Sequence, residues 1–273
     1  FDLTVAVGDI VPIIGARLVK APFVFIGVNK SDHYKWFGFS YTPWEKWLLK
    51  TYAKKIFVRD RLTAENLNRQ GVPAEYVGNP LMDCFEQITN NKSQITNKSQ
   101  LSNLKTIGFL PGTRSDAKLN LDDFEKVAAE LVNLKDPDTE FKFLVAASLP
   151  GSPEFMQKKP FNEVLAEADL VVGLSGTGNE QAAGSGLPVV SFYGRGSQYN
   201  KKFAQAQKQL LGESLGLVKT NDPRTVAAAV WQILKSPDTM ARMGQAGRER
   251  MGESGAVARI VSFILGYNIQ KSF

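Results

Sequence analysis

Residues 171–193 most constrain the fold, because they have the pattern of one complete β-turn-α-β unit. The apolar strand Leu170–Gly173 leads into a polar turn made of Ser175, Gly176, Thr177 and Gly178; a short helix (179–184) and the apolar strand Val189–Phe192 follow. Such a turn presents backbone N–H groups at a helix N-terminus, where the helix dipole favours an anion. We therefore expect a phosphate site at this turn. The alternative is an ordinary crossover whose glycines only allow close packing.

The rest of the chain alternates short apolar strands with helices. We expect strands at 3–7, 23–28, 55–58, 75–77, 106–110 and 141–147, and helices at 11–19, 43–54, 60–71, 121–134, 162–168, 223–235, 238–251 and 256–265. This alternation is typical of an α/β fold with parallel, doubly wound sheets. With 273 residues, 43% of them hydrophobic, the chain is long enough for two cores. We predict two Rossmann-like domains, residues 1–87 and 105–273, the second including the C-terminal helices.

Residues 88–104 are predicted to link these domains. The segment is polar and repeats Asn-Lys-Ser-Gln at positions 91 and 97, so it has little apolar surface to bury. A solvated helix extension is the alternative. The first domain has too few expected strands for a complete mononucleotide-binding half. We therefore expect that the first strands of an N-terminal domain are missing from the chain.

Composition excludes several classes of site. A single cysteine, Cys84, rules out an internal disulfide and a cysteine-based zinc site, and a single histidine, His33, leaves few routes to a His-rich metal centre. No apolar run approaches the roughly 20 residues of a membrane span. The net charge is +6, with basic clusters at 46–55 and 242–250 that suit either solvated helix faces or an anionic surface. No nucleic-acid-binding pattern is present, so we expect no nucleic-acid partner.

The central unit resembles the sugar-nucleotide site of GT-B glycosyltransferases, and most closely that of lipid-A-disaccharide synthases. The resemblance rests on Ser-Gly-Thr at Ser175 and on Pro188, thirteen residues later. In that family a Glu six residues after the Ser binds the ribose of the UDP donor. Here the sixth residue is Gln181, with Glu180 beside it. The resemblance implies that the turn Ser175–Gly178 holds the donor diphosphate and that Glu180 with Gln181 holds the ribose. Asn179, between them, is expected to belong to the same substrate-binding site.

A second segment, Leu-Pro-Gly-Thr-Arg at residues 110–114, resembles the Leu-Pro-Gly-Ser-Arg run that opens the C-terminal domain of the same family. Gly112 lets the backbone approach a ligand, Thr113 offers a hydroxyl, and the guanidinium of Arg114 fits phosphate oxygens. We expect Arg114 to contact the diphosphate. The alternative is an arginine that merely lies at the surface.

Three further residues have both a functional and a structural interpretation. Asn79 and Asp83, in a turn that resembles the one closing the family's N-terminal domain, are expected either to approach a sugar hydroxyl or to form an Asn-Pro turn and the N-cap of the next helix. Arg195, in the Gly-rich segment 194–199, either reaches a phosphate or belongs to a simple bend.

Asp9, at the carboxyl end of the first strand, is the predicted general base, because the family has an Asp after the equivalent strand. An inverting displacement requires a base, such as a carboxylate in the active-site cleft, that takes the proton of the acceptor hydroxyl. His33, beside Asp32, is the rival base. The family's fold needs no metal, no Asp-x-Asp dyad occurs in a loop here, and we expect no cofactor.

The resemblance implies a metal-independent, inverting glycosyltransferase that moves an N-acetylglucosamine derivative from a UDP-sugar to a lipid-linked sugar acceptor. A cytoplasmic protein in peripheral contact with the inner membrane would suit that acceptor. Candidate contacts are Trp36, Phe37, Phe39, Trp44 and Trp47, and core packing is the alternative for these aromatics. The rivals are a UDP-sugar 2-epimerase and a non-catalytic nucleotide-sugar-binding protein. The oligomeric state stays open.

Overall fold

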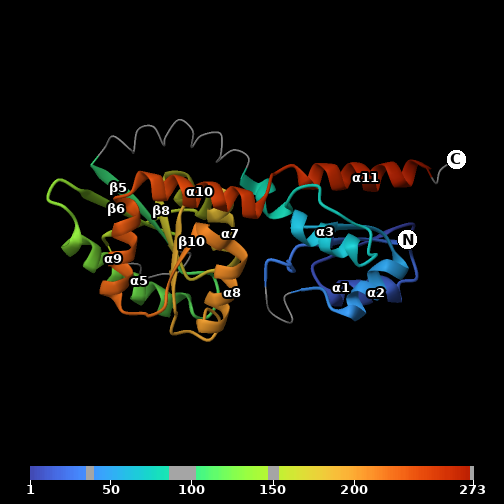
Figure 1. Cartoon of the computed structure of the whole chain (residues 1–273), viewed down its shortest axis with the longest axis horizontal. Coiled ribbons are helices and arrows are strands. Elements are labelled where there is room, and N and C mark those ends of the chain that lie inside the picture. The colour runs from blue at the N-terminus through green and yellow to red at the C-terminus, as the bar shows by residue number, and fades with distance from the viewer. Residues whose placement is uncertain (35–39, 86–102, 147–153, 271–273) are drawn as a thin grey trace. The chain divides into compact units, whose positions relative to one another are not determined.

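The computed structural model describes residues 1–34, 40–85, 103–146 and 154–270 and divides the chain into two compact units (Figure 1). Unit 1 consists of Phe1–Cys84 and Met251–Phe273, and unit 2 of Phe85–Arg250. Each unit contains a parallel sheet whose strands are separated along the chain by helices. This arrangement confirms the predicted fold class. Residues 88–102 of the predicted linker lie outside the described residues.

The described part of unit 1 is built on a four-stranded parallel sheet of order β1-β2-β3-β4. Its strands are β1 (Thr4–Val7), β2 (Phe23–Gly27), β3 (Ala53–Val58) and β4 (Ala74–Glu75). The intervening helices are α1 (Ile10–Leu18), α2 (Pro43–Tyr52) and α3 (Arg61–Arg69), and the 3-10 helix η1 (Pro80–Phe85) follows β4. The core forms where Phe23, Phe25 and Ile56 of the sheet meet Ile13, Leu49 and Leu67 of the helices.

The C-terminal helix, α11 (Ala256–Gln270), belongs to unit 1 and not to the second domain that we predicted for residues 105–273. Ile260 is buried with Val24 and Phe57 on one face of the unit 1 sheet, and the Phe263 ring lies edge-on to Phe57 at 5.7 Å between centroids. The apolar spacing at Val257, Ile260, Val261 and Ile264 predicts a buried helix face. Ile260 is buried and Ile264 is partly buried, but Val257 and Val261 are 47% and 44% exposed, so the prediction is wrong for the two valines. The apolar spacing also does not predict on which sheet this helix packs.

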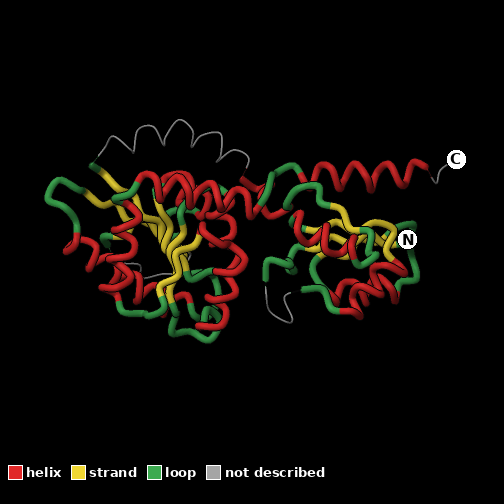
Figure 2. The backbone as a smooth tube through the Cα atoms, viewed as in Figure 1, coloured by secondary structure: helices red, strands yellow, loops and turns green. Residues whose placement is uncertain are grey.

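Unit 2 contains, within its described residues, a six-stranded parallel sheet of order β10-β9-β8-β5-β6-β7 (Figure 2). The strands are β5 (Leu104–Leu110), β6 (Glu140–Val145), β7 (Met156–Lys158), β8 (Leu170–Gly173), β9 (Val189–Phe192) and β10 (Leu215–Val218). The chain builds outward from β5 to β7, then returns to place β8 on the other side of β5. Open α/β sheets bind ligands at such a switch point, outside the carboxyl ends of the two strands.

Helices cover both faces of the unit 2 sheet. They are α5 (Ala117–Leu134), α6 (Phe161–Glu167), α7 (Gly176–Gly184), α8 (Lys201–Leu211), α9 (Pro223–Leu234) and α10 (Pro237–Met251), with the 3-10 helix η2 (Gly212–Ser214) after α8. Ile107 and Phe109 share one core with α5 and α9, while Gly108 between them faces α6. Among the described helices, none is both long and apolar enough to cross a membrane.

Candidate functional site

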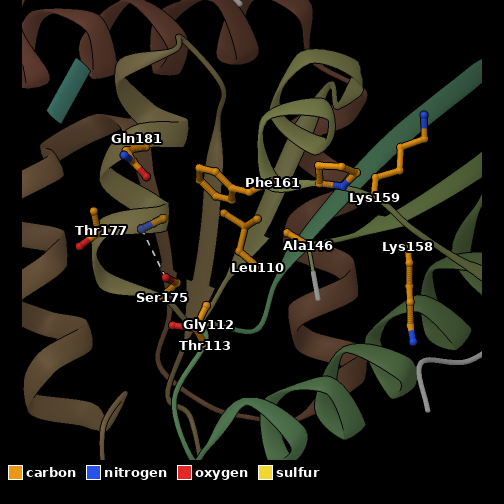
Figure 3. A pocket seen from close by; sticks show the side chains of 12 residues that line it. Leu110, Gly112, Thr113, Ala146, Lys158, Lys159, Phe161, Ser175, Thr177 and Gln181 are labelled. Carbon is orange, nitrogen blue, oxygen red and sulfur yellow. Dashed lines mark hydrogen bonds between the residues drawn. The ribbon is translucent and has the colours of Figure 1, made fainter. Parts of the chain in front are cut away.

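A pocket of about 620 Å³ lies in unit 2 at the switch point between β5 and β8 (Figure 3). Its walls come from the carboxyl ends of β5 and β7, from the residues that directly follow β6 and β8, and from the starts of α6 and α7. The lining residues are Leu110, Gly112, Thr113, Ala146, Lys158, Lys159, Pro160, Phe161, Ser175, Thr177, Gly178 and Gln181. The pocket thus joins the two segments that the sequence singled out for phosphate.

The turn after β8 is the first turn of α7, since the helix begins at Gly176 and not at residue 179 as predicted. Ser175 is the N-cap: its Oγ accepts a hydrogen bond from Gly178 N–H at 3.3 Å, drawn in Figure 3. The N–H groups of Gly176 and Thr177 have no acceptor among the described residues. Free N–H groups at a helix N-terminus favour an anion.

The segment after β5 contributes Gly112 and Thr113 to the pocket. The amide of Asn120 in α5 holds this segment by donating to the Pro111 carbonyl at 2.9 Å. Arg114 is exposed and is not among the lining residues. Its guanidinium forms no ion pair with a described residue, so the proposed diphosphate contact of Arg114 stays a prediction.

Adjacent residues of α7 point in different directions. Gln181 lines the pocket, as Figure 3 shows, whereas Glu180 is buried against α8, where its Oε1 accepts from Gln207 Nε2 at 3.1 Å. Asn179 is completely buried and hydrogen-bonds the Gly173 carbonyl. The ribose role expected for Glu180 and the substrate contact expected for Asn179 therefore find no support in this geometry, and Gln181 alone of the three lines the pocket.

Sequence reasoning missed one wall of the pocket, which is formed by Lys158, Lys159, Pro160 and Phe161. Lys159 Nζ pairs with Glu167 and lies 3.6 Å from Glu163; the hydrogen bond that Lys159 donates to Glu167 raises the pKa of Lys159. The available signal was the run Lys-Lys-Pro-Phe directly before the predicted helix 162–168. It was hidden because β7, which ends there, is only three residues long.

Arg195 lies outside the pocket lining and has a structural partner. Its Nη2 is 2.6 Å from Asp123 Oδ1 and its Nε 3.0 Å from Asp123 Oδ2, and the hydrogen bond with Asp123 raises the pKa of Arg195. The ion pair fastens the segment after β9 to α5. This arrangement favours the structural interpretation of Arg195 over a phosphate contact.

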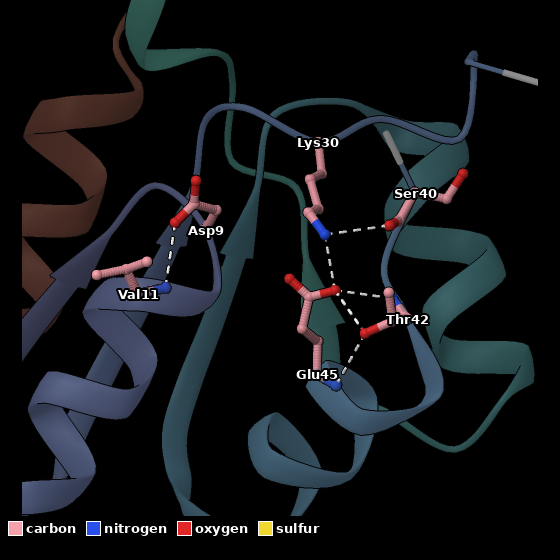
Figure 4. A network of polar contacts seen from close by, with 6 residues as sticks. All are labelled: Asp9, Val11, Lys30, Ser40, Thr42 and Glu45. Carbon is pink, nitrogen blue, oxygen red and sulfur yellow. Dashed lines mark hydrogen bonds and ion pairs between the residues drawn. The ribbon is translucent and has the colours of Figure 1, made fainter. Parts of the chain in front are cut away.

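In unit 1, Asp9 follows β1 and is the N-cap of α1, because its Oδ1 accepts from Val11 N–H at 3.2 Å (Figure 4). Figure 4 also shows Glu45 Oε2 accepting from Lys30 Nζ at 2.7 Å and from the Thr42 N–H at 2.8 Å. His33, the rival base, has Nε2 4.0 Å from Asp60 Oδ1, and the Asp32 N–H donates to Thr63. Asp9 is partly exposed at the carboxyl end of its strand, where a base is possible.

Asn79 and Asp83 fix the return of the chain into unit 1. Asn79 is 1% exposed; its Nδ2 donates to the Met251 carbonyl at 2.8 Å and its Oδ1 accepts from Leu81 N–H at 3.1 Å. The Asp83 carboxylate accepts from the N–H groups of Ala256 and Val257 at the start of α11. The geometry supports the structural alternative for both residues, with Asp83 capping α11 rather than the helix that follows it in sequence.

The part of the chain that the structure describes holds no group of three or more His, Cys, Asp or Glu side chains arranged to bind a metal ion. No family model matches the chain.

Curated relatives with significant similarity are lipid-A-disaccharide synthases. The chain is 24% identical over 225 residues to that of Trichlorobacter lovleyi, covering 71% of this chain and 57% of the relative. It is 25% identical over 222 residues to that of Syntrophotalea carbinolica, covering 71% and 56%. The chain therefore spans somewhat more than half the length of these relatives.

Solved structures with a similar fold include a putative UDP-N-acetylglucosamine 2-epimerase from Listeria monocytogenes (TM-score 0.64, 17% identity, 98% of this chain and 75% of that one). The UDP-GlcNAc 2-epimerase from Neisseria meningitidis bound to UDP-GlcNAc gives a TM-score of 0.58 at 15% identity, covering 97% and 76%. The calicheamicin glycosyltransferase CalG4 gives 0.64 at 15% identity, covering 100% and 76%. The chain thus has the GT-B fold, and over 71% of its length it is similar in sequence to lipid-A-disaccharide synthases.

Proposed function

We propose that this protein is a glycosyltransferase that moves a sugar, an N-acetylglucosamine derivative, from a UDP-sugar to a lipid-linked sugar acceptor. The observation that carries the proposal is the pocket at the β5/β8 switch point, where the N–H groups of Gly176 and Thr177, at the N-terminus of α7, meet an aromatic and apolar wall. The names of the curated relatives support the same reaction class.

In this proposal the diphosphate of the donor lies at the N–H groups of Gly176 and Thr177. The Gln181 amide is the hydrogen-bonding partner of the ribose, taking the place of the family's Glu. The uracil base of the donor packs between the flat ring of Phe161 and the apolar side chain of Leu110. A volume of about 620 Å³ falls within the range of roughly 300–1,000 Å³ usual for small-molecule sites.

The proposed reaction is an in-line displacement. The acceptor hydroxyl oxygen bonds to the anomeric carbon of the donor sugar while the bond from that carbon to the β-phosphate oxygen breaks, and UDP leaves with inversion. Asp9 takes the proton of the hydroxyl. The α7 N-terminus and Arg114 stabilise the negative charge that develops on the leaving diphosphate, which is how we propose the reaction proceeds without a resident metal.

Peripheral contact with the inner membrane, on its cytoplasmic side, forms part of the proposal. Trp44 and Trp47 of α2 are 59% and 48% exposed, which contradicts the core alternative for these two rings. Lys46 and Lys50 lie on the same helix and would suit anionic headgroups. Trp36, Phe37 and Phe39 lie outside the described residues.

A UDP-sugar 2-epimerase is the alternative enzyme, since solved structures with this fold carry that name. The paired-acid motif that the sequence offered for it depends on Glu180, which faces α8 instead of the pocket. A non-catalytic nucleotide-sugar-binding protein is the other alternative. Radiolabelled donor incubated with and without a lipid-linked acceptor separates the three: transfer, epimerisation without acceptor, or binding without turnover.

The first test is calorimetric titration of UDP and UDP-N-acetylglucosamine into the wild type, Arg114→Ala and Arg242→Ala. Arg242 is an exposed arginine of α10 and serves as the matched control. We expect the wild type and the control to bind, and Arg114→Ala to bind about tenfold more weakly, as expected for one charge-assisted phosphate contact. No binding by a folded wild type would overturn the nucleotide-sugar proposal.

A further inference from the structure

A closed ring of hydrogen bonds lies buried behind the first turn of α7. Asn179 Nδ2 donates to the Gly173 carbonyl at 3.2 Å and to the Tyr199 hydroxyl at 3.1 Å. The Ser191 hydroxyl is 2.7 Å from the Tyr199 hydroxyl and 2.7 Å from the same Gly173 carbonyl. Asn179, Ser191 and Tyr199 are all less than 4% exposed.

The chemistry of the groups fixes the direction of every bond in this ring. The Gly173 carbonyl can only accept, so the single proton of Ser191 points to it. Tyr199 must then donate its proton to Ser191 Oγ, which leaves the Tyr199 oxygen to accept from Asn179. Burial raises the pKa of Tyr199 well above its ordinary value, so the phenol keeps the proton that it donates.

The ring connects three elements and the segment that follows β9. Gly173 ends β8, Asn179 lies in α7, Ser191 lies in β9, and Tyr199 follows β9. The contact at Gly173 is so close that a Cβ there would lie 1.9 Å from Asn179 Oδ1. The ring therefore ties α7 to the strand that leads into it.

Tyr199 is also tied to the other phosphate segment. The N–H of the preceding residue, Gln198, donates to Asp116 Oδ2 at 2.7 Å, and its side chain donates to Ser115 Oγ at 3.0 Å. Asp116 and Ser115 directly follow Arg114 in the chain. One segment thus contacts both sides of the switch point.

We propose that Tyr199 is a positioning residue of this pocket: through Asn179 and Ser191 it fixes the first turn of α7 against the end of β8, and so orients the N–H groups that face the anion. The identity of the ligand rests on the proposed function; the positioning itself does not.

Removing the Tyr199 hydroxyl would leave two buried groups without partners. Ser191 Oγ would lose its donor, and one N–H of the Asn179 amide would lose its acceptor. Asn179 Oδ1 already has no partner, so the amide would depend on the Gly173 contact alone. Unpaired buried polar groups drive local rearrangement, here at the turn that lines the pocket.

The test compares Tyr199→Phe with Tyr193→Phe. Tyr193 is a matched control, because it stands in the same segment and its hydroxyl accepts one hydrogen bond, from Gln205 at 3.1 Å, outside the ring. Amide hydrogen exchange of residues 174–184 reports the order of the turn without any ligand. We expect about tenfold faster exchange there in Tyr199→Phe and no change in Tyr193→Phe.

The second readout is the Kd for UDP, measured well below each variant's Tm. We expect about tenfold weaker binding for Tyr199→Phe, equivalent to one buried hydrogen bond. Ser191→Ala should lower the UDP affinity less in the Tyr199→Phe background than in the wild type, because both changes break the same ring. Unchanged exchange in residues 174–184 would overturn the positioning role. Faster exchange with an unchanged Kd would also overturn the positioning role, because Tyr199 would then contribute only to the stability of the fold. If the wild type fails to bind UDP, the proposed function fails, while exchange still decides the positioning role.

Discussion

Asp83 caps a helix that begins 173 residues later: its Oδ2 accepts from Val257 N–H at 2.5 Å and its Oδ1 from Ala256 N–H at 3.2 Å. A cap of this kind contributes about 1 kcal/mol. We expect Asp83→Ala to lower the free energy of unfolding by about that amount and to speed amide exchange at the start of α11. Asp222→Ala, which removes the local cap of α9 in unit 2, should leave α11 exchange unchanged. Equal α11 exchange in Asp83→Ala and wild type would contradict the capping role.

Gln181 and Glu180 should respond differently to truncation. Gln181 lines the pocket and Glu180 contacts Gln207 of α8, so we expect Gln181→Ala to weaken UDP binding about fivefold to tenfold. Glu180→Gln should keep wild-type affinity, because its side chain does not reach the pocket. Calorimetry on both variants gives the answer, and the reverse ranking would return the ribose to Glu180.

Glu167 predicts a pH dependence of unit 2. Burial alone would raise the pKa of Glu167, but hydrogen bonds from Lys142 and Lys159 outweigh it and lower the pKa below its ordinary value. A carboxylate with a lowered pKa stabilises the fold above its unfolded pKa of 4.5, and this stability disappears as the pH falls through the folded pKa. We expect Glu167→Gln to lower the Tm at pH 7 and to lose this effect near pH 3.

The control for Glu167 is Glu140→Gln, since Glu140 is exposed and forms no ion pair within the described residues. Its Tm difference from the wild type should stay small at both pH values. A Glu167→Gln effect that is the same at pH 7 and near pH 3 would mean that the ion pairs do not contribute.

Alanine at two glycines should have opposite effects. A Cβ at Gly173 would lie 1.9 Å from Asn179 Oδ1, whereas a Cβ at Gly15 in α1 has no heavy atom within 4 Å. We expect Gly173→Ala to destabilise unit 2 by about 2 kcal/mol or more, and Gly15→Ala to stabilise unit 1 by about 0.5–1 kcal/mol through helix propensity. Urea unfolding measures both, and a neutral Gly173→Ala would contradict the packing described for the hydrogen-bonded ring.

We expect Trp44 and Trp47 to contact a membrane surface and not to pack in the core. Because both rings are largely exposed, replacing them together by Ser should leave the Tm nearly unchanged. Co-sedimentation with vesicles containing anionic phospholipid should fall severalfold. The matched control is Trp231→Ser, whose ring packs on Phe141 in unit 2; it should lower the Tm without weakening sedimentation. Unchanged sedimentation of the Trp44 and Trp47 variant would exclude this helix as the contact.

The parallel sheets were predictable because strands such as Leu170–Gly173 and Val189–Phe192 are short, wholly apolar and separated by helices. The strand β7 and the helix α8 were not. β7 has one apolar residue, Met156, and is defined by backbone pairing with β6. The start of α7 was also missed, since two glycines in three residues disfavour a helix. The Ser175 cap and the contacts of Asn179 hold those residues helical.

The site was predictable at the level of segments and not of side chains. Both predicted phosphate segments line one pocket, because β5 and β8 pair at the switch point. Which of two adjacent α7 residues faces that pocket depends on α8, which lies more than twenty residues further along and was not predicted. The diphosphate role of Arg114 and the base role of Asp9 stay predictions.

Unit 2 is one continuous stretch of chain inserted into unit 1, and Asn79 hydrogen-bonds Met251 near the two points where the chain leaves and returns. A deletion that ends the chain at residue 250 would therefore damage the first unit, by exposing Val24 and Phe57, and not the second. To express unit 1 alone, this connectivity suggests a gene in which a short flexible linker joins residue 84 to residue 251. Residues 103–250 can be expressed for unit 2 without any such splice.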